Sequence, residues 1–414
     1  MKRKNLYNII TQGISDMMII WMNELKNVVK DQGILIFFIF VPLGYPLLYT
    51  YIYNNEVIRE VPVAAVDDNR SSMSREFLKY VDANPDTRIV TYPANIEDAK
   101  KAMMEGMIYG IIYIPNDFTK TLVKGEQANV SIFCDLSGML YYKALLTSAT
   151  NSSLMMNKEI KISKMGNSTD RQDEIATAPI AYEDIALFNP QAGFASFLIP
   201  AVLILIIQQT LLLGIGLAAG TARENNRFRD LVPINRHYHG TLRIVLGKSL
   251  LYFMLYVIMS TYILVFVPKM FSLPQIGNPF TIAQFILPYL LSAIFFAMTC
   301  SVLIRHRETC MIVYIFTSVP LLFISGISWP GTAIPEFWKI VSYIFPSTFG
   351  INGFVQINNM GATIEDVSTG YKALWIQAGI YFITTFFVYR YQIIMSRRHV
   401  WRRYKEISRK KRIK

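Results

Sequence analysis

The sequence has 414 residues, of which 52% are hydrophobic and 17% are charged, and its formal net charge is +12. Because soluble domains carry roughly 25% charged residues, this composition argues against a soluble globular protein and indicates an integral membrane protein. The basic residues collect in short segments between apolar stretches, so an anionic membrane surface accounts for the positive charge without nucleic acid binding.

Residues 1–31 are predicted to form an amphipathic helix that lies in the cytoplasmic membrane interface. Apolar residues recur at helical spacing from Leu6 to Val28, and most of the polar residues fall on other faces. Trp21 would then lie at the depth of the lipid headgroups. A helix that packs on a soluble partner or domain is the alternative interpretation.

Residues 32–54 are predicted to form the first transmembrane helix. The run 32–55 carries no charge, and about 20 apolar residues are enough to cross a bilayer core as a helix. Pro42 and Pro46 remove backbone donors, so they should bend the helix. Neighbouring helices can satisfy the carbonyl groups that such a bend frees.

Residues 55–188 are predicted to form an extracytoplasmic α/β domain. Short apolar runs alternate with amphipathic helical patterns, which is typical of an α/β layer. The segment 54–190 holds 19 acidic and 14 basic residues, which favours an external position. Cys134 is its only cysteine, so no internal disulfide is expected. The predicted strands are 61–68, 87–93, 109–115 and 128–135, and the predicted helices are 72–83, 95–107, 116–125 and 138–164.

Residues 189–395 are predicted to contain transmembrane helices 2–6, and a basic cytoplasmic tail, 396–414, follows them. Arg and Lys gather in 220–248, 305–308 and 390–414, whereas 268–279 and 331–372 carry few. Because cytoplasmic loops are enriched in basic residues, this alternation predicts six spans with both termini in the cytoplasm. The predicted spans lie within 185–222, 249–267, 270–304, 309–328 and 373–389.

The second span is predicted to begin with Asn189 as its N-cap and Pro190 in its first turn. Gln208 and Gln209 lie near its middle. A polar side chain at that depth faces either a neighbouring helix or a substrate path, and both interpretations stay open.

A charged segment, 220–236, follows this span and is predicted to be a cytoplasmic loop. The preceding residues 185–219 carry no charge. Gly216 and Gly220 are four residues apart, a spacing that allows another helix to approach closely. The charges that follow them are Arg223, Glu224, Arg227, Arg229 and Asp230.

The sequence Gly247-Lys248-Ser249 invites comparison with a phosphate-binding loop. That motif needs a glycine five residues before Gly247, where this chain has Leu242. We therefore expect no nucleotide site in this chain and interpret Lys248 as a basic anchor at the start of the third span. No metal site is expected, because the sequence has no Cys-x-x-Cys motif or Cys/His cluster.

The segment 323–354 is too interrupted by glycine and proline to be a straight span. We predict short helical pieces that form a re-entrant segment near 329–354, anchored at the outer interface by tryptophan. Its distinctive residues are Ser325, Gly326, Pro330, Pro335, Trp338 and Pro346.

Several of these features together resemble the membrane subunit of an ABC-2 type exporter, in the group with a large external domain between spans one and two. The matching stretches are VAAVDDNRSSMSREFLKYV, the spacing of Gly106, Gly110 and Gly125, the FNP that contains Asn189 and Pro190 together with Pro200, LGKSLLY, and SGISWP with Pro335, Trp338 and FPST.

The resemblance implies an α-helical integral membrane protein with six transmembrane helices and an inserted α/β extracytoplasmic domain. It also implies a homo- or heterodimer in the bacterial cytoplasmic membrane that works with a cytoplasmic ABC ATPase, which binds the ATP and Mg. The charges between Arg223 and Asp230 would then couple to the ATPase, and Gln208 and Gln209 could line a translocation path. A periplasmic adaptor is a further expected partner.

Two other functions are compatible with the residues. One is a membrane-anchored sensor or scaffold whose external domain binds a ligand, and the other is a membrane enzyme that acts on lipid. Spans two to six contain almost no ionisable groups, which argues against the enzyme. The identity of the cargo cannot be inferred from the sequence.

Overall fold

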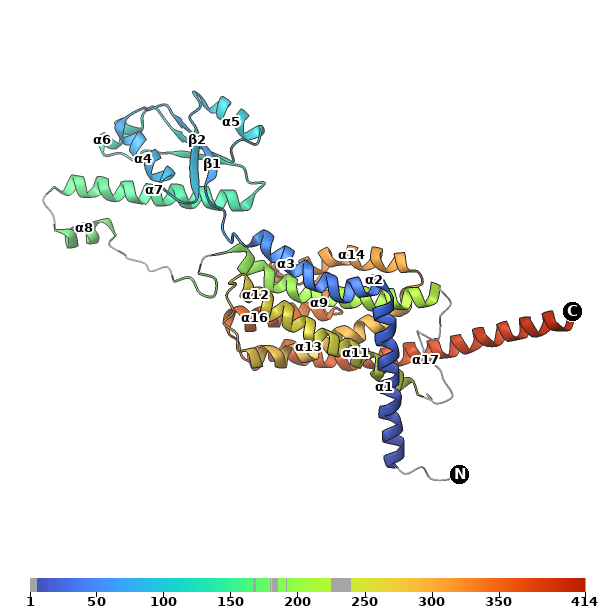
Figure 1. Ribbon diagram of the computed structural model, residues 1–414. Helices are drawn as coiled ribbons and strands as arrows, with labels where there is room; N and C mark the ends of the chain where they lie inside the picture. Colours follow the sequence, from blue (N-terminus) through green and yellow to red (C-terminus); the bar gives the residue numbers. More distant parts are fainter. Residues whose placement is uncertain are drawn as a thin grey trace. The chain divides into compact units, whose positions relative to one another are not determined.

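The computed structural model describes residues 6–166, 169–178, 180, 185–190, 192–224 and 240–413, and for 6–10 and 396–413 it describes the backbone alone. The chain forms two units, shown in Figure 1. One is helical and combines Met1–Glu56 with Ala186–Lys414. The other is Val57–Ile185, an α/β unit inserted between them in the sequence.

Five helices or continuous helical runs of the helical unit are long and apolar enough to cross a membrane. They are Gln32–Tyr53, Phe194–Glu224, Thr241–Met270, Pro279–Leu303 and Arg307–Ile324. A further pair, bent by 90°, makes six if it is one broken span. The elements are α1 Leu6–Lys30, α2 Gln32–Leu35, η1 Ile36–Phe40, α3 Val41–Tyr53, α9 Phe194–Glu224, α11 Thr241–Thr261, η2 Tyr262–Phe266, α12 Val267–Met270, α13 Pro279–Cys300, η3 Ser301–Leu303, α14 Arg307–Ile324, η4 Gly331–Ala333, α15 Glu336–Ser342, α16 Pro346–Met360 and α17 Ser368–Ile413.

Helix α9 forms the centre of the bundle (Figure 1). It is buried along nearly its whole length, including Pro200, and it contacts α3, α13, α14 and α16. A helix that is apolar on every face must be covered by protein or lipid on every face. In α9 the cover is protein, namely the four neighbouring helices. By contrast, α3 and α14 leave many large apolar side chains exposed.

The N-terminus of α9 differs from the prediction, because the helix begins at Phe194 rather than at Pro190. The Asn189 side chain instead closes a turn with the backbone of Gly193, through bonds of 3.0 and 2.9 Å. The first turn of α9 is capped from a distant part of the sequence. The Glu56 carboxylate accepts bonds from the Ser196 N–H (3.1 Å) and hydroxyl (2.6 Å), and an anion is favourable at a helix N-terminus.

The expected span 373–389 lies within α17, which is not among the five helices that meet the length and composition test. It nevertheless lies alongside α13. Phe285 contacts Tyr371 near one end, and Thr299 bonds Thr385 at 2.9 Å near the other. The two helices therefore run in the same direction over about 21 Å, at about 1.5 Å per residue.

The first span is irregular next to its prolines. A π-helical turn, η1, precedes Pro42, and Pro46 lies inside α3. The Tyr262 hydroxyl on the π-helical turn η2 donates to the Leu43 carbonyl at 3.0 Å. A neighbouring helix thus supplies a donor to the backbone between the two prolines.

The segment after α14 consists of short helices, as predicted. Pro335 directly precedes α15, Pro346 is the first residue of α16, and the two helices meet at 90°. Gly326 has a φ of +88°, a conformation that suits glycine and ends α14. Trp338 on α15 is 51% exposed, which agrees with an interfacial position.

The spacing of Gly216 and Gly220 creates a close contact between α9 and α14. A Cβ on Gly216 would lie 2.6 Å from the Cys310 Sγ and 2.9 Å from the Tyr314 ring. We therefore expect Gly216→Ala to lower the thermal unfolding temperature of the purified protein, because overpacking costs about 1–3 kcal/mol. Gly44→Ala on α3 is the matched control, since nothing lies within 4 Å of its Cβ position. Equal unfolding temperatures for the two variants would contradict this packing.

The α/β unit contains a four-stranded sheet in the order β2-β1-β3-β4. β1 is parallel to β2 and β3, whereas β4 is antiparallel to β3. The strands fall within the predicted ranges, and Asn95 and Gly125 cap helices as their residue types suggest. The bounds are β1 Val61–Asp67, α4 Ser72–Asp82, β2 Thr87–Thr91, α5 Ile96–Met104, β3 Gly110–Ile114, α6 Phe118–Lys124, β4 Ser131–Cys134, α7 Met139–Met165 and α8 Asp170–Thr177.

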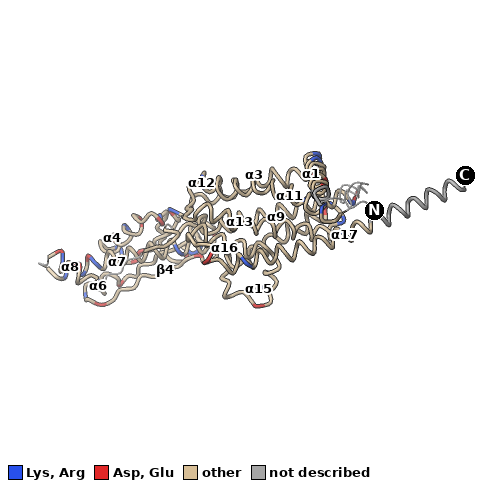
Figure 2. The backbone as a smooth tube through the Cα atoms, turned by 90° about the horizontal axis from the view of Figure 1, so that it is seen from below, with Lys and Arg blue, Asp and Glu red and all other residues tan. Residues whose placement is uncertain are grey.

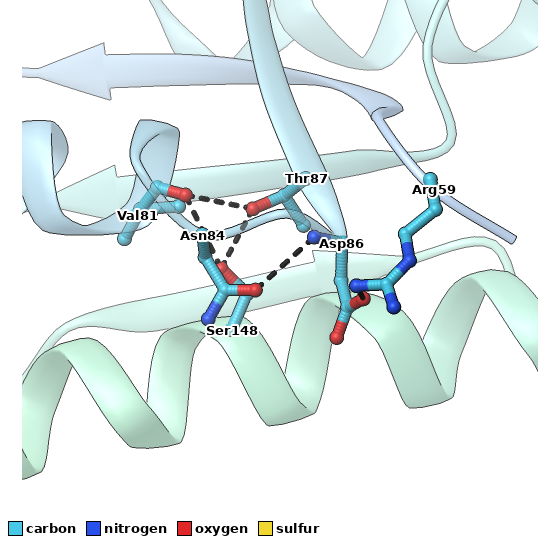
Figure 3. Close-up of polar contacts among 6 residues, drawn as sticks. All are labelled: Arg59, Val81, Asn84, Asp86, Thr87 and Ser148. Atoms are coloured by element: carbon cyan, nitrogen blue, oxygen red, sulfur yellow. Dashed lines mark hydrogen bonds and ion pairs between the residues drawn. The ribbon is translucent and has the colours of Figure 1, made fainter. Parts of the chain in front are cut away.

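Helices cover both faces of this sheet. α4, α6 and α7 pack on one face, and α5 packs on the other. Figure 3 shows how the start of β2 is held: the Thr87 hydroxyl donates to the Val81 carbonyl at 2.8 Å and contacts the Ser148 hydroxyl on α7 at 2.6 Å. These bonds connect α4, β2 and α7, so they fix α4 against the edge of the sheet.

Candidate functional site

Three ion pairs attach α1 and the residue that follows it, Asp31, to the end of the helical bundle, where charged residues gather (Figure 2). They are Asp16 with Arg243, Glu24 with Lys248 at 2.8 Å, and Asp31 with Arg307 at 3.0 Å. The partners on the bundle belong to α11 and α14. Because the acids lie about two turns apart along the chain, the pairs hold α1 along much of its length.

The pair of Glu24 and Lys248 is the most buried of the three, with side chains 5% and 6% exposed. The Tyr252 hydroxyl also donates to Glu24. Lys248 is therefore not the anchor at the start of a span that the sequence suggested. It lies two turns inside α11, which begins at Thr241. Buried charges require such partners, since each ion loses its hydration.

Gly247, which precedes Lys248, lies at a close contact between two helices. A Cβ on Gly247 would lie 3.0 Å from the Met17 carbonyl oxygen and from Ile20, so α1 crosses α11 at this point. The resemblance of Gly247-Lys248-Ser249 to a phosphate loop thus reflects a helix crossing with a buried ion pair. Among the described residues, no group of three or more His, Cys, Asp or Glu side chains could hold a metal ion.

Helix α9 extends further into the predicted charged loop than expected, through Glu224. The Arg223 guanidinium donates to the Ser301 carbonyl at 2.7 Å and to the Ile304 carbonyl. Arg223 thus ties α9 to the segment between α13 and α14, whereas Glu224 has no ion pair among the described residues. Arg227, Arg229 and Asp230 lie outside the described residues.

A cavity of about 710 Å³ opens at this same end of the bundle. The elements α1, α2, α9, α11 and α14 line it, and two of the ion pairs, the buried pair of Glu24 with Lys248 and the partly exposed pair of Asp31 with Arg307, form part of its wall. Its charged groups are thus largely neutralised by one another. A shift of α1 would change the shape of this cavity directly.

Further along the bundle, α3, α9 and α14 line a second cavity of about 330 Å³, which opens onto the exposed faces of α3 and α14. Its lining is mostly apolar, with side chains such as Phe37, Leu205 and Leu322. Gln209 is its distinctive polar residue. The amide is 7% exposed, and neither its oxygen nor its nitrogen has a hydrogen-bond partner within the described part of the chain.

The adjacent Gln208 has a different role. Its amide nitrogen donates to the Ser347 hydroxyl at 3.0 Å, and its oxygen accepts the Ser347 N–H at 2.7 Å. Gln208 therefore caps α16 and joins it to α9. Gln208 thus contacts a neighbouring helix. Gln209 instead lies in the wall of a cavity.

Two of the remaining motif residues, Ser325 and Pro330, lie between α14 and the bent pair of helices α15 and α16. The Ser325 carbonyl accepts a bond of 3.0 Å from the Asn352 amide of α16, which joins the end of α14 to the returning helix. Pro330 directly precedes the short helix η4 and is exposed. None of these residues lines either cavity.

A bundle of long apolar helices defines a multi-pass membrane protein. Residues 33–387 match the family model described as ABC-2 family transporter protein, so this chain belongs to that family. The resemblance to the ABC-2 type permeases is thus confirmed, and the chain is a membrane subunit of an ABC transporter. No curated protein and no solved structure matches the chain.

Proposed function

We propose that this chain is the permease of an ABC exporter that moves a hydrophobic or amphipathic substrate outward across the bacterial cytoplasmic membrane. The observation that carries the proposal is the apolar cavity between α3, α9 and α14 with the unpartnered amide of Gln209. A mostly apolar lining that also holds a buried amide without a hydrogen-bond partner among the described residues suits a substrate that has a large apolar part and few polar atoms.

The exposed faces of α3 and α14 support a dimer. Both helices flank this cavity, and both carry large exposed apolar residues, including Leu48 and Tyr51 on α3 and Phe316 and Val319 on α14. In the dimer, a second copy or a related subunit packs against these faces. The two cavities then face each other across the interface and form one path.

The position of the basic residues supports the proposed orientation of the bundle in the membrane. The end of the bundle that holds Arg223, Arg243 and Arg307 is the cytoplasmic end under the positive-inside rule. This assignment makes α17 the sixth crossing, parallel to α13, and leaves both termini in the cytoplasm. The α/β unit then lies outside the cytoplasm.

A separate ATPase supplies ATP hydrolysis and binds the ATP and Mg. It docks at the cytoplasmic end, where Glu224 has no ion pair among the described residues. Arg223 transmits the movement inward, because it ties α9 to the segment before α14. The ion pairs of α1 move α11 and α14 together with it, and this changes the path between the two subunits.

The test is purification of the tagged chain from its native membranes in mild detergent, with measurement of the co-purifying ATPase activity. We expect Glu224→Arg to lower that activity several-fold, because charge reversal opposes docking. Glu336→Arg on α15 is the control, since it makes the same charge reversal at an exposed position on a different helix. If no ATPase co-purifies with the native chain, the exporter proposal fails. If both variants retain full activity, the docking site lies elsewhere.

A further inference from the structure

The α/β unit contains a cavity of about 680 Å³ at the carboxyl ends of β1 and β2. Its walls are the end of β1, one face of α4 and the segment 92–94 that follows β2. Sheets with parallel strands bind ligands outside the carboxyl ends of those strands. The volume lies within the range of small-molecule sites.

Three cationic side chains line this cavity: Arg70, Arg75 and Lys79. Arg75 and Lys79 are one turn apart on the same face of α4. Among the described residues, none of the three forms an ion pair. Other basic residues of the same unit do pair with acids, namely Arg59, Arg88, Lys100 and Arg171.

The two acidic side chains of the cavity accept hydrogen bonds from uncharged donors. Asp67 accepts the N–H groups of Asn69 at 3.1 Å and Arg70 at 2.9 Å, and also the Ser74 hydroxyl at 2.7 Å. Asp82 accepts the Ile89 N–H at 2.8 Å. Three cationic side chains against two carboxylates leave the lining with a small formal excess of positive charge, although the segment 54–190 as a whole has more acidic than basic residues.

An aromatic side chain completes the wall. Tyr92 is 66% exposed, and Pro93 lies beside it in the lining. Partial burial, together with the negative charge of Asp82, raises the pKa of the Tyr92 hydroxyl, which therefore stays protonated and able to donate. Its ring offers a flat surface on which a sugar or another ring can stack.

We propose that this cavity binds a phosphate group carried by a small polar molecule. The arginine guanidinium groups match the paired oxygens of a phosphate, and Lys79 adds a point charge. Such a group occurs on soluble sugar or glycerol phosphates and on phospholipid headgroups. The site lies outside the helical unit, so it is independent of the proposed transport path.

The test is calorimetric titration of the full-length protein in detergent with glycerol phosphate, inorganic phosphate and dihexanoyl phosphatidylglycerol below its micelle concentration. We expect saturable binding of at least one of these phosphates. Arg75→Gln with Lys79→Gln should weaken it about tenfold or more, because both substitutions remove charged donors, whose hydrogen bonds to phosphate are stronger than those of neutral donors. Tighter binding of the soluble phosphates indicates a soluble ligand, and tighter binding of the short lipid indicates a headgroup.

The matched control is Lys120→Gln with Lys124→Gln on α6, which removes the same charge from exposed positions outside the cavity. It should bind as the native protein does. The proposal is overturned if no phosphate binds, if the α4 variant binds normally, or if both variants lose affinity equally. Unchanged circular dichroism and unfolding temperature show that the α4 variant is folded.

Discussion

Replacing Lys248 with methionine is expected to destabilise the protein by about 3–5 kcal/mol, because it leaves the Glu24 carboxylate buried without its counter-charge. Methionine keeps most of the volume and the flexibility of lysine, so little of the loss comes from a cavity. The measurement is the thermal unfolding of the purified protein in detergent, followed by light scattering and tryptophan fluorescence. The unfolding temperature should fall by several degrees.

A second substitution shows whether charge is the cause. Glu24→Gln in the Lys248→Met background removes the unpaired charge and still accepts the Tyr252 hydroxyl, so it should restore most of the lost stability. Lys26→Met removes an exposed lysine from the same helix and should leave stability nearly unchanged. If the double variant is no more stable than Lys248→Met alone, the buried pair is not the source of the loss.

The neighbouring glutamines of α9 are expected to respond in opposite ways to substitution by leucine. Gln208→Leu removes the partner of the Ser347 N–H and hydroxyl, both buried, and each unsatisfied group costs about 1–3 kcal/mol. Gln209→Leu removes a buried amide that has no partner among the described residues. It should leave stability unchanged or raise it. The same unfolding assay measures both effects.

A transport assay is expected to distinguish Gln209 from Gln208 further. In proteoliposomes that contain the permease and its ATPase, Gln209→Leu should alter substrate-stimulated ATP hydrolysis although the protein is fully folded. That outcome follows from the amide's position in the cavity wall. If Gln209→Leu destabilises the protein as much as Gln208→Leu, Gln209 has a packing role. Its amide is then not the polar group that the cavity offers to a substrate.

Local features of the fold could be predicted from the sequence. The strands of the α/β unit, the cap at Asn95 and the αL end at Gly125 each depend on residues close together in the chain. The short helices after Gly326 depend on proline and glycine in the same way. The apolar runs predicted the membrane-spanning helices because length and hydropathy are local properties.

Features that depend on distant partners could not be predicted. Asn189 and Pro190 have the residue types of a helix start, but Glu56 supplies the cap and the helix begins later. Lys248 looked like a surface anchor because its partner lies more than two hundred residues earlier in the chain. For the same reason, adjacent and identical side chains, Gln208 and Gln209, could not be told apart.

Glu56 has a wider consequence for how this chain is assembled. Its carbonyl accepts the Phe194 N–H at 2.8 Å, and its carboxylate holds Ser196. The chain therefore leaves the bundle and returns to it at a single closed junction, formed entirely by residues of the helical unit. Once the junction forms, closing a longer intervening segment costs little extra entropy, roughly 0.6 kcal/mol for each doubling of its length. The inserted segment can thus gain, lose or exchange whole elements during evolution while the packing of α3 against α9 stays the same.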